Sequence, residues 1–416
     1  MKSRAYFDHA AATPVNPLVL KAMEPFWALD FANPSAIHKE GVFARRAVED
    51  ARAKVATLLG VHADEIVFTG SATESCNLAL FGAVRAWQQT HPGRTAHIIV
   101  SAIEHDAVLG PARSLEKSDV RVTRLPVDAR GVVDVEALGA ALDTDTVLVS
   151  VMYANNEIGT IQPIRDIAKV IRRWKKEVRG VARDRKPEGD ECYPLFHTDA
   201  TQAVNYCDVY VPHLVVDLLT LNAAKIYGPK GVGVLVVLRG TSVAPVVVGG
   251  GHERGYRSGT ENVPSIIGFA EALRIARELA TSESARLVAL RDHTICELKK
   301  IPGLLINGDE HERLPNNVNF SLPGVDHEFL ALQLDAKGFA VATKSACNET
   351  DAETSHVLAA LREADGTSAP KSGIRLSFGR ETTKRDIDAF LRTLREIEKF
   401  VLEYYEQEKY FSLDTL

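Results

Sequence analysis

The sequence predicts an α/β fold in which a mostly parallel sheet lies between helices, with a smaller α/β domain beside it. From about Gly41 onward, helical patterns alternate with short apolar runs, which is typical of a sheet covered by helices on both faces. The chain has 416 residues, more than one ordinary hydrophobic core accommodates. Its pattern also changes after Thr260. We therefore expect a large domain over residues 16–264, and a small domain formed by residues 1–15 and 265–416.

The large domain is predicted to contain one well-marked helix followed by a series of strands. Apolar residues recur on one helical face from Val42 to Leu59, and Gly60 ends the pattern. Polar residues at the ends of the strands are the first candidates for a site, because ligands of such folds bind at the carboxyl ends of strands. The apolar runs interpreted as buried strands are Glu65–Phe68, His97–Ser101, Val120–Leu125, Val147–Val151, Leu195–His197, Leu218–Leu221 and Gly231–Leu238.

The small domain is predicted from a mixture of longer helical patterns and short strands. The charged segment from Arg172 to Glu191, in the large domain, is interpreted as a solvated helix end followed by a surface loop. In the small domain the expected helices are Val263–Leu279, Glu283–Lys300, Glu328–Lys337, Glu353–Glu363 and Lys384–Gln407, and the expected strands are Leu304–Ile306, Asn317–Leu322 and Gly373–Ser377.

Composition narrows the class of protein. A net charge of −6 argues against direct nucleic-acid binding, and no apolar run approaches the ~20 residues that span a bilayer. Because the strand-like residues Ala5 to Phe7 come so early, we expect no leader peptide. The five cysteines form no zinc spacing and no even disulfide framework. We expect a cytoplasmic protein without a membrane partner and without a resident metal.

Lys225 is the most informative single residue. It lies between two apolar runs, at the expected mouth of a buried sheet. Desolvation there lowers the pKa of an amine and favours its neutral, nucleophilic form. An isolated lysine in a loop would more simply reach out to solvent. Lys225 is therefore informative because other polar residues fit the same chemistry.

The loop from Gly70 to Glu74 joins a predicted strand to an apolar helix. Small residues at a helix N-terminus expose backbone N–H groups to an anion, and Thr73 adds a hydroxyl. The spacing of Ser71 and Glu74 equally satisfies an ordinary capping box. The two interpretations are compatible.

Three further strand ends carry polar side chains. His105 could stack on a planar cofactor and move protons near neutral pH. Asp199 could pair with a protonated pyridine nitrogen. Gln202 and Asn156 could donate to an oxygen of the same ring. Each of these residues alone would be interpreted as a polar loop residue.

Two residues of the small domain complete the candidates. Cys347 lies in a small, polar stretch that indicates an exposed thiol, whereas Cys76, Cys192, Cys207 and Cys296 are interpreted as packing residues. Arg375 is a charge in an apolar strand pattern. It could bind a substrate carboxylate or form a structural salt bridge, and both interpretations stay open.

Taken together, these segments resemble the cysteine desulfurases, fold-type I pyridoxal-phosphate enzymes of the class V aminotransferase superfamily. The resemblance covers nearly the whole chain. It runs in order through Tyr6–Pro14, Asn33–Ser35, Ala72–Glu74, Glu104–His105, Asn155–Gly159, Asp199–Gln202, Lys225–Gly231, Gly249–Gly255, Arg257–Thr260, Ser345–Cys347 and Arg375–Arg380.

The resemblance implies that pyridoxal 5′-phosphate is the cofactor and assigns the residues around it. Lys225 would hold the cofactor covalently, His105 would stack on its ring, and Asp199 would pair with the pyridine nitrogen. The other implied contacts are Asn156 and Gln202 to the ring substituents, Ala72, Thr73 and the Asn222 position to the phosphate, Thr260 to the phosphate of a partner subunit, and Asn33 and Arg375 to the substrate carboxylate.

The resemblance also implies the reaction and the partners. L-cysteine would yield L-alanine and a persulfide on Cys347, with Lys225 and His105 as the other catalytic residues. A homodimer would pass the sulfur to an acceptor protein in iron–sulfur cluster assembly or thiolation. Cys347 could also ligate an iron–sulfur cluster transiently.

Two alternatives to a cysteine desulfurase stay open, and one of them, a non-catalytic scaffold, rests on residues that depart from the family pattern. Many members have histidine before the lysine and a small hydroxyl residue nearby, where this chain has Ala224 and the pair Asn222-Ala223. A related selenocysteine lyase is one alternative. A non-catalytic scaffold derived from the family is the other, although Lys225 and Cys347 together argue against it.

Overall fold

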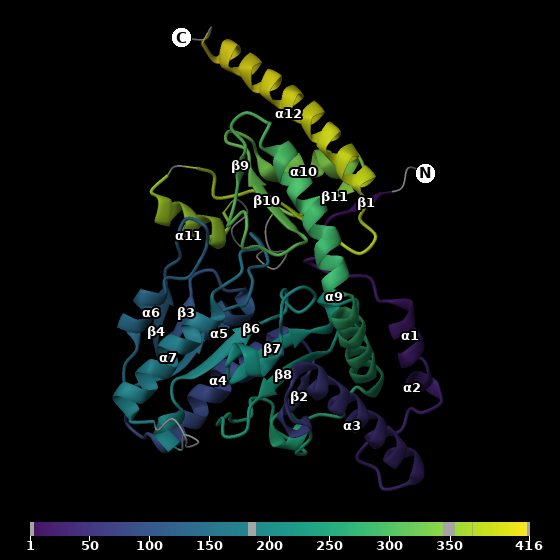
Figure 1. The fold of residues 1–416 in the computed structure, drawn as a ribbon, viewed down its shortest axis with the longest axis vertical. Helices are drawn as coiled ribbons and strands as arrows, with labels where there is room; N and C mark the ends of the chain where they lie inside the picture. Colours follow the sequence, from purple (N-terminus) through teal and green to yellow (C-terminus); the bar gives the residue numbers. More distant parts are fainter. Residues whose placement is uncertain (1–3, 182–188, 344–353, 368, 414–416) are drawn as a thin grey trace.

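The structure is a computed structural model, and it describes residues 4–181, 189–343, 354–367 and 369–413, with backbone alone from 399 onward. The large domain fills one end of the molecule and the small domain the other (Figure 1). Within the described residues, no helix is both long enough and apolar enough to cross a membrane.

The large domain contains a seven-stranded, mostly parallel sheet, as the sequence predicts. Its strand order is β2-β8-β7-β6-β5-β3-β4. Neighbours from β7 through β4 pair in parallel, whereas β8 runs antiparallel to both β7 and β2. The strands are β2 (Ile66–Thr69), β3 (His97–Ser101), β4 (Arg121–Leu125), β5 (Thr146–Ser150), β6 (Leu195–Asp199), β7 (Leu218–Asn222) and β8 (Gly233–Val237).

Helices cover both faces of this sheet. Alternate strand residues form two separate cores, because successive side chains of a strand point to opposite faces. One core includes α4 (Ala72–Thr90) and α5 (Asp106–Glu116). The other core includes α3 (Lys39–Leu59), α6 (Val135–Ala141), α7 (Ile164–Arg179) and α8 (Val211–Leu214).

Helix α3 ends where the sequence predicts. Gly60 follows it with φ of 72° in the left-handed region, a conformation that glycine adopts without a steric penalty. Two short helices, α1 (Pro17–Met23) and α2 (Pro25–Ala28), precede α3 at the N-terminal side.

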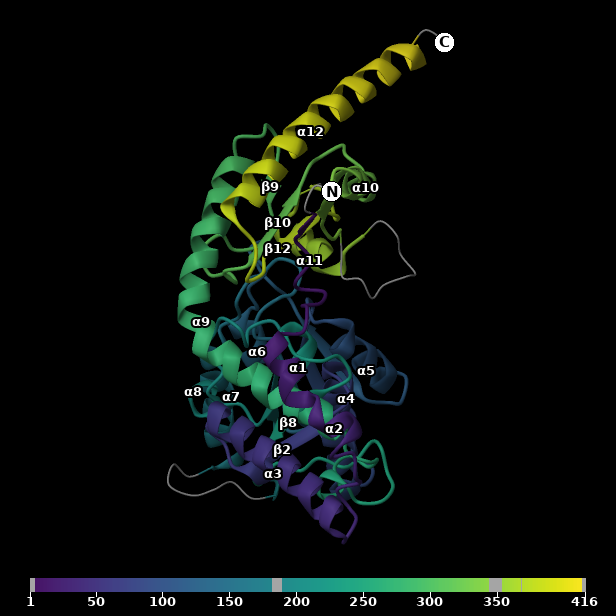
Figure 2. The ribbon, with the colours of Figure 1, turned by 90° about the vertical axis from the view of Figure 1, so that its right-hand side faces the viewer.

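The small domain is built around a three-stranded antiparallel sheet. Its order is β12-β10-β9, with β9 (Leu305–Ile306), β10 (Asn317–Ser321) and β12 (Ile374–Ser377). The N-terminal strand β1 (Ala5–Tyr6) pairs in parallel with β11 (Phe339–Ala340). Phe7, the next residue, packs in the hydrophobic core of the small domain. Helices α10 (His327–Ala336) and α12 (Lys384–Leu413) complete the domain, and the end of α12 projects from the body of the molecule (Figure 2).

One helix links the two domains, and here the prediction of two helices was wrong. Instead of Val263–Leu279 and Glu283–Lys300, a single helix α9 runs from Val263 to Leu298. Thr281 and Ser282 are weak helix formers but neither is a breaker, and Ser282 Oγ donates within the helix to the carbonyl of Leu279 at 3.1 Å.

Helix α9 contributes to both domain cores. Its first half packs in the core of the large domain, and Leu287, Ile295 and Leu298 pack in that of the small domain. Helix α11 (His356–Asp365) also packs against the large domain through Val357 and Leu361. The boundary near residue 265 therefore stays a prediction.

The charged segment after α7 is only partly within the described residues. Its first part is the end of α7, which terminates at Arg179 with Gly180 in the left-handed region. A short 3₁₀ helix, Gly189–Cys192, leads into β6. The predicted loop at residues 182–188 lies outside the described residues.

Candidate active site

A cavity of about 220 Å³ lies at the carboxyl ends of the sheet strands, next to β12 of the small domain. Most of the residues predicted for the site line it. Its lining is Ala10, Ala11, Ala72, Thr73, His105, Ala107, Met152, Ala154, Asn156, Asp199, Thr201, Gln202, Asn222, Lys225 and Arg375.

Lys225 reaches the cavity because β7 ends one short turn before it. Asn222 ends the strand, and its Oδ1 accepts a hydrogen bond from the Ala224 N–H at 3.1 Å, which starts the 3₁₀ turn Ala223–Lys225. The N-terminal segment is bonded to this turn, since Thr13 Oγ1 donates to the carbonyl of Ala224 at 3.0 Å. Lys225 Nζ donates to the carbonyl of Ala11. Hydrogen bonds between these side chains and the backbone of the turn therefore fix the base of the lysine side chain.

Asp199 is the last residue of β6, and a neighbouring backbone N–H holds one oxygen of its carboxylate. Oδ1 accepts from the Thr201 N–H at 2.9 Å, and the residue is 7% exposed. Gln202 follows on the same loop and donates from Nε2 to the carbonyl of Ala10 at 3.0 Å. A buried carboxylate at a cavity is suited to pairing with a cationic ring nitrogen.

His105 caps the start of α5 and lines the cavity. Its Nδ1 accepts from the Ala107 N–H at 3.0 Å, so the proton of the neutral ring is assigned to Nε2. Burial lowers the pKa of His105, and the nearby Asp199 carboxylate opposes that shift. The imidazole is therefore neutral near pH 7 and presents a donor at Nε2.

The first turn of α4 forms another wall of the cavity through Ala72 and Thr73. Ser71 Oγ accepts from the Glu74 N–H at 3.2 Å, so the helix is capped as the spacing predicts. The reciprocal bond differs from a capping box, because Glu74 Oε2 accepts from the Gly70 N–H at 2.8 Å. A Cβ on Gly233 would lie 2.6 Å from the backbone of Ser71, so β8 approaches this turn closely only as glycine.

Arg375 forms the salt bridge that one of its two interpretations predicts, and it also lines the cavity. It is 2% exposed, and Nη2 donates to Asp8 Oδ1 at 2.7 Å while Nη1 donates to the carbonyl of Asn156 at 3.0 Å. This ion pair supports the structural interpretation. Arg375 nevertheless lines the cavity, and its buried Nε has no hydrogen-bond partner in the described part of the chain.

Three predicted residues are not brought together in this cavity. Asn33 is exposed and its Oδ1 accepts from the Ser35 N–H, and Thr260 is also exposed. Neither residue belongs to the cavity lining. Cys347 lies outside the described residues.

The described residues on both sides of segment 344–353 attach beside the cavity. Before it, Ala342 and Arg375 exchange backbone hydrogen bonds. After it, Ser355 Oγ donates to Glu157 Oε2 at 2.6 Å, and His356 Nε2 lies 2.9 Å from the carbonyl of Glu104. The described residues that flank this segment are therefore bonded to a cavity-lining residue, Arg375, and to direct neighbours of the lining residues His105 and Asn156.

Sequence reasoning missed Thr201 and misjudged Cys296. The buried Thr201 Oγ1 lines the cavity and lacks a partner among the residues described, and its position between Asp199 and Gln202 was the available signal. Cys296 is exposed on α9, so interpreting it as a packing residue was wrong. A helical neighbourhood does not say which face a side chain occupies.

A lysine, a carboxylate and an imidazole around a cavity at strand ends define an enzyme site on an α/β fold. A model of the aminotransferase class-V family matches residues 5–181 and 189–390, so the chain belongs to that family.

Similarity to individual proteins narrows the activity further than the family does. Cysteine desulfurase IscS of Dictyoglomus turgidum is 43% identical over 411 residues, which is 98% of each chain. A solved NifS-like protein is 36% identical, with a TM-score of 0.83, over 95% of this chain and 100% of its own. A structure described as SspA in complex with cysteine is 32% identical, with a TM-score of 0.73, over 90% of this chain and 98% of its own. The recognition of a cysteine desulfurase from the sequence is confirmed.

Proposed function

We propose that the protein removes sulfur from L-cysteine at this cavity, with pyridoxal 5′-phosphate held on Lys225, and leaves the sulfur as a persulfide on Cys347. The observation that carries the proposal is the convergence of Lys225, Asp199 and His105 on one cavity beside both ends of the segment that contains Cys347. The cysteine bound in the complex of the related SspA supports the choice of substrate.

The residues present fit the proposed cofactor. The cavity brings together an amine, a buried carboxylate and the first turn of a helix, which suit its aldehyde, its ring nitrogen and its phosphate. Two buried polar atoms at the cavity, Thr201 Oγ1 and Arg375 Nε, have no protein partner among the described residues, which is consistent with a polar ligand. Asn222 Oδ1 is bonded to the Ala224 N–H, so its amide nitrogen is the group left to contact phosphate.

The chain's own residues divide the work of the reaction. When bound, the cofactor withdraws electrons from Cα of the substrate. Asp199 holds the proton at the ring nitrogen, Arg375 binds the substrate carboxylate through its unpartnered Nε, and the Lys225 amine moves the Cα proton. The thiolate of Cys347 attacks the substrate sulfur, forming the S–S bond as the C–S bond breaks. Cβ keeps the electron pair and is protonated, which gives L-alanine.

The persulfide then passes to a sulfur-acceptor protein. The name of the Dictyoglomus turgidum relative supports iron–sulfur cluster assembly as the pathway, and thiolation is the other pathway expected from the sequence. Cys76, Cys207 and Cys296 form no disulfide within the described residues, which supports a reducing, cytoplasmic compartment.

A homodimer completes the proposal. Large apolar side chains are exposed along α1, α2 and the connection to α3, and a contiguous exposed apolar surface marks an interface. They include Leu18 at 58%, Trp27 at 62%, Leu29 at 81%, Phe31 at 75% and Ile37 at 94% exposure. The exposure of Thr260 and Asn33 outside the cavity of their own chain is consistent with roles toward a partner subunit.

The test measures L-alanine and sulfide released from L-cysteine in the presence of a reductant. The wild type should give equimolar products, and Cys347→Ala should lose both while retaining the yellow absorbance of the bound cofactor. Equal activity in Cys347→Ala would contradict the persulfide route and favour a direct lyase. No turnover by the wild type despite bound cofactor would contradict the desulfurase itself.

A further inference from the structure

Cys76 is buried directly behind Asp199 and contacts it. Its side chain is 0% exposed, and Sγ lies 3.9 Å from Asp199 Oδ2 and 3.8 Å from Thr220 Oγ1. Asp199 and Thr220 are opposite each other in the pairing of β6 with β7, so α4 places the thiol over this strand pair. These distances are within the range of hydrogen bonds to sulfur.

The contact belongs to a buried polar chain. Thr220 Oγ1 lies 3.0 Å from His197 Nε2, and His197 Nδ1 lies 2.8 Å from Ser150 Oγ. Burial lowers the pKa of His197 to about 4, so the ring is neutral and can both donate and accept. Burial also raises the pKa of Cys76 well above its ordinary value, so the sulfur keeps its proton and is a donor.

Helix α4, which carries Cys76, also forms the wall of the cavity that is proposed to bind phosphate. Ala72 lines the cavity, and Cys76 is one turn further along the same helix face. Oδ1 of Asp199 is held by the Thr201 N–H, so Cys76 is the described donor at the second oxygen. One helix therefore contributes to the phosphate end of the cavity and orients the carboxylate at the ring-nitrogen end.

We propose that Cys76 is a positioning residue for Asp199, whose thiol hydrogen bond to Oδ2 fixes the carboxylate for pairing with the ring nitrogen of the cofactor. The inference rests on the proposed cofactor. Without that bond the carboxylate loses one of its two described donors, and an unpaired buried carboxylate is less favourable. Cys76 makes no contact with the substrate and acts only through Asp199.

The test compares Cys76→Ala with Cys76→Ser, which restores a donor of similar size. Apoprotein is titrated with pyridoxal 5′-phosphate, and the absorbance of the bound cofactor is followed against pH. Cys76→Ala should weaken cofactor binding about threefold to tenfold, the range expected for the net contribution of one ordinary hydrogen bond, and should shift the pH midpoint of the absorbance. Cys76→Ser should restore both toward the wild type.

A matched control comes from Cys207, whose pKa burial raises to about 12 but for which no bond to Asp199 is described. Cys207→Ala should leave affinity and midpoint unchanged. Wild-type values in Cys76→Ala, or equal losses in Cys76→Ala and Cys76→Ser, would overturn the proposal, because equal losses indicate packing alone. Should Cys76→Ala not fold, Cys76→Val fills the space without a donor and makes the same comparison. Failure of the wild type to bind the cofactor would instead overturn the proposed function.

Discussion

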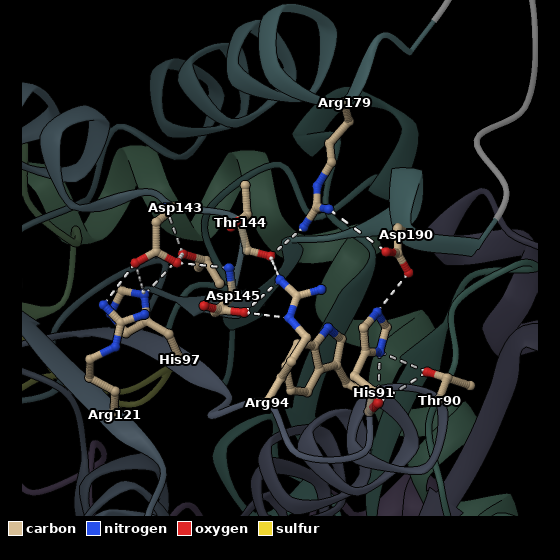
Figure 3. A network of polar contacts seen from close by, with 12 residues as sticks. Thr90, His91, Arg94, His97, Arg121, Asp143, Thr144, Asp145, Arg179 and Asp190 are labelled. Carbon is tan, nitrogen blue, oxygen red and sulfur yellow. Dashed lines mark hydrogen bonds and ion pairs between the residues drawn. The ribbon is translucent and has the colours of Figure 1, made fainter.

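The two edges of the large sheet carry similar residue types arranged in opposite ways. At the amino ends of the strands, charged and polar side chains are bonded to one another (Figure 3). Arg121 pairs with Asp143 at 2.7 Å, Arg94 donates from Nε to Asp145 Oδ1 at 2.9 Å, and His91 lies 2.8 Å from Asp190. At the carboxyl ends, polar side chains surround a cavity instead.

The two edges differ in how many buried polar atoms lack a hydrogen-bond partner. At the carboxyl edge, buried atoms of Glu104, Thr201 and Arg375 lack hydrogen-bond partners among the described residues, whereas at the amino edge only Arg179 Nε does. Unsatisfied buried polar groups are costly and are retained mainly where a ligand completes them. The carboxyl edge is therefore suited to chemistry and the amino edge to stability.

The largest expected effect is a loss of activity at the carboxyl edge alone. Lys225→Ala removes the group that moves the substrate proton and should lower desulfurase activity by about 10²–10⁴-fold or more. Arg94→Ala changes a cation at the opposite edge and should keep activity within about twofold of the wild type, the small effect typical of exposed pairs. Alanine release from L-cysteine measures both variants. A comparable loss in Arg94→Ala would remove the distinction between the edges.

The second prediction concerns pH and Glu104, which is buried behind the cavity. Its Oε1 accepts from Ser101 Oγ at 2.5 Å and from the Met152 N–H at 2.7 Å, while Oε2 lacks a partner in the described structure. Burial raises the pKa of Glu104 from 4.5 to about 8. The folded protein therefore holds a proton that the unfolded chain releases above its ordinary pKa, so stability falls as pH rises from about 4.5 through about 8.

Glu104→Gln keeps the shape of the side chain and removes this titration. The melting temperature of the variant should rise relative to the wild type as pH increases from 5 to 8.5, by about a few degrees. Thermal unfolding at several pH values measures the difference. A constant difference across that range would show that Glu104 does not titrate with folding.

Much of this site could be predicted from the sequence because its residues are local to strand ends. Asp199 and Lys225 follow apolar runs directly, so their meeting at one edge follows from the geometry of a parallel sheet. Cys76 could not be assigned in the same way. Its contact with Asp199 spans 123 residues, and a cysteine in an apolar helix is otherwise a packing residue.

The continuity of α9 and the amino-edge network have similar causes. The two halves of α9 pack against different domains, and this packing stabilises one continuous helix. The sequence around Thr281 and Ser282 gives no sign of that packing. The pairs at the amino edge join residues far apart in sequence, such as Arg94 and Asp145. A charge pattern alone does not identify such partners.

At the amino edge itself, Asp143 should be important for stability but not for activity. It accepts from the Asp145 N–H at 2.9 Å and from Thr146 Oγ1 at 3.2 Å, and it pairs with Arg121. Asp143→Ala should lower the free energy of unfolding by about 1–2 kcal/mol, because several hydrogen bonds are lost together. Urea denaturation gives this value, and unchanged alanine release is the expected companion result. A loss of activity without a loss of stability would reverse the assignment of the two edges.

The smallest effect is expected for the ion pair of Arg94 with Asp145, whose side chains are 40% and 34% exposed. A double-mutant cycle of Arg94→Ala and Asp145→Ala should give a coupling energy below about 1 kcal/mol, and 1 M salt should reduce it further. Arg94 also lies over the ring of Trp87 at 5.4 Å, a contact that the cycle leaves out because it is lost in Arg94→Ala with or without Asp145. A coupling of several kcal/mol that persists in salt would mean that the ion pairs of the amino edge are as desolvated as the groups at the cavity. The contrast between the two edges would then rest on the presence of the cavity alone.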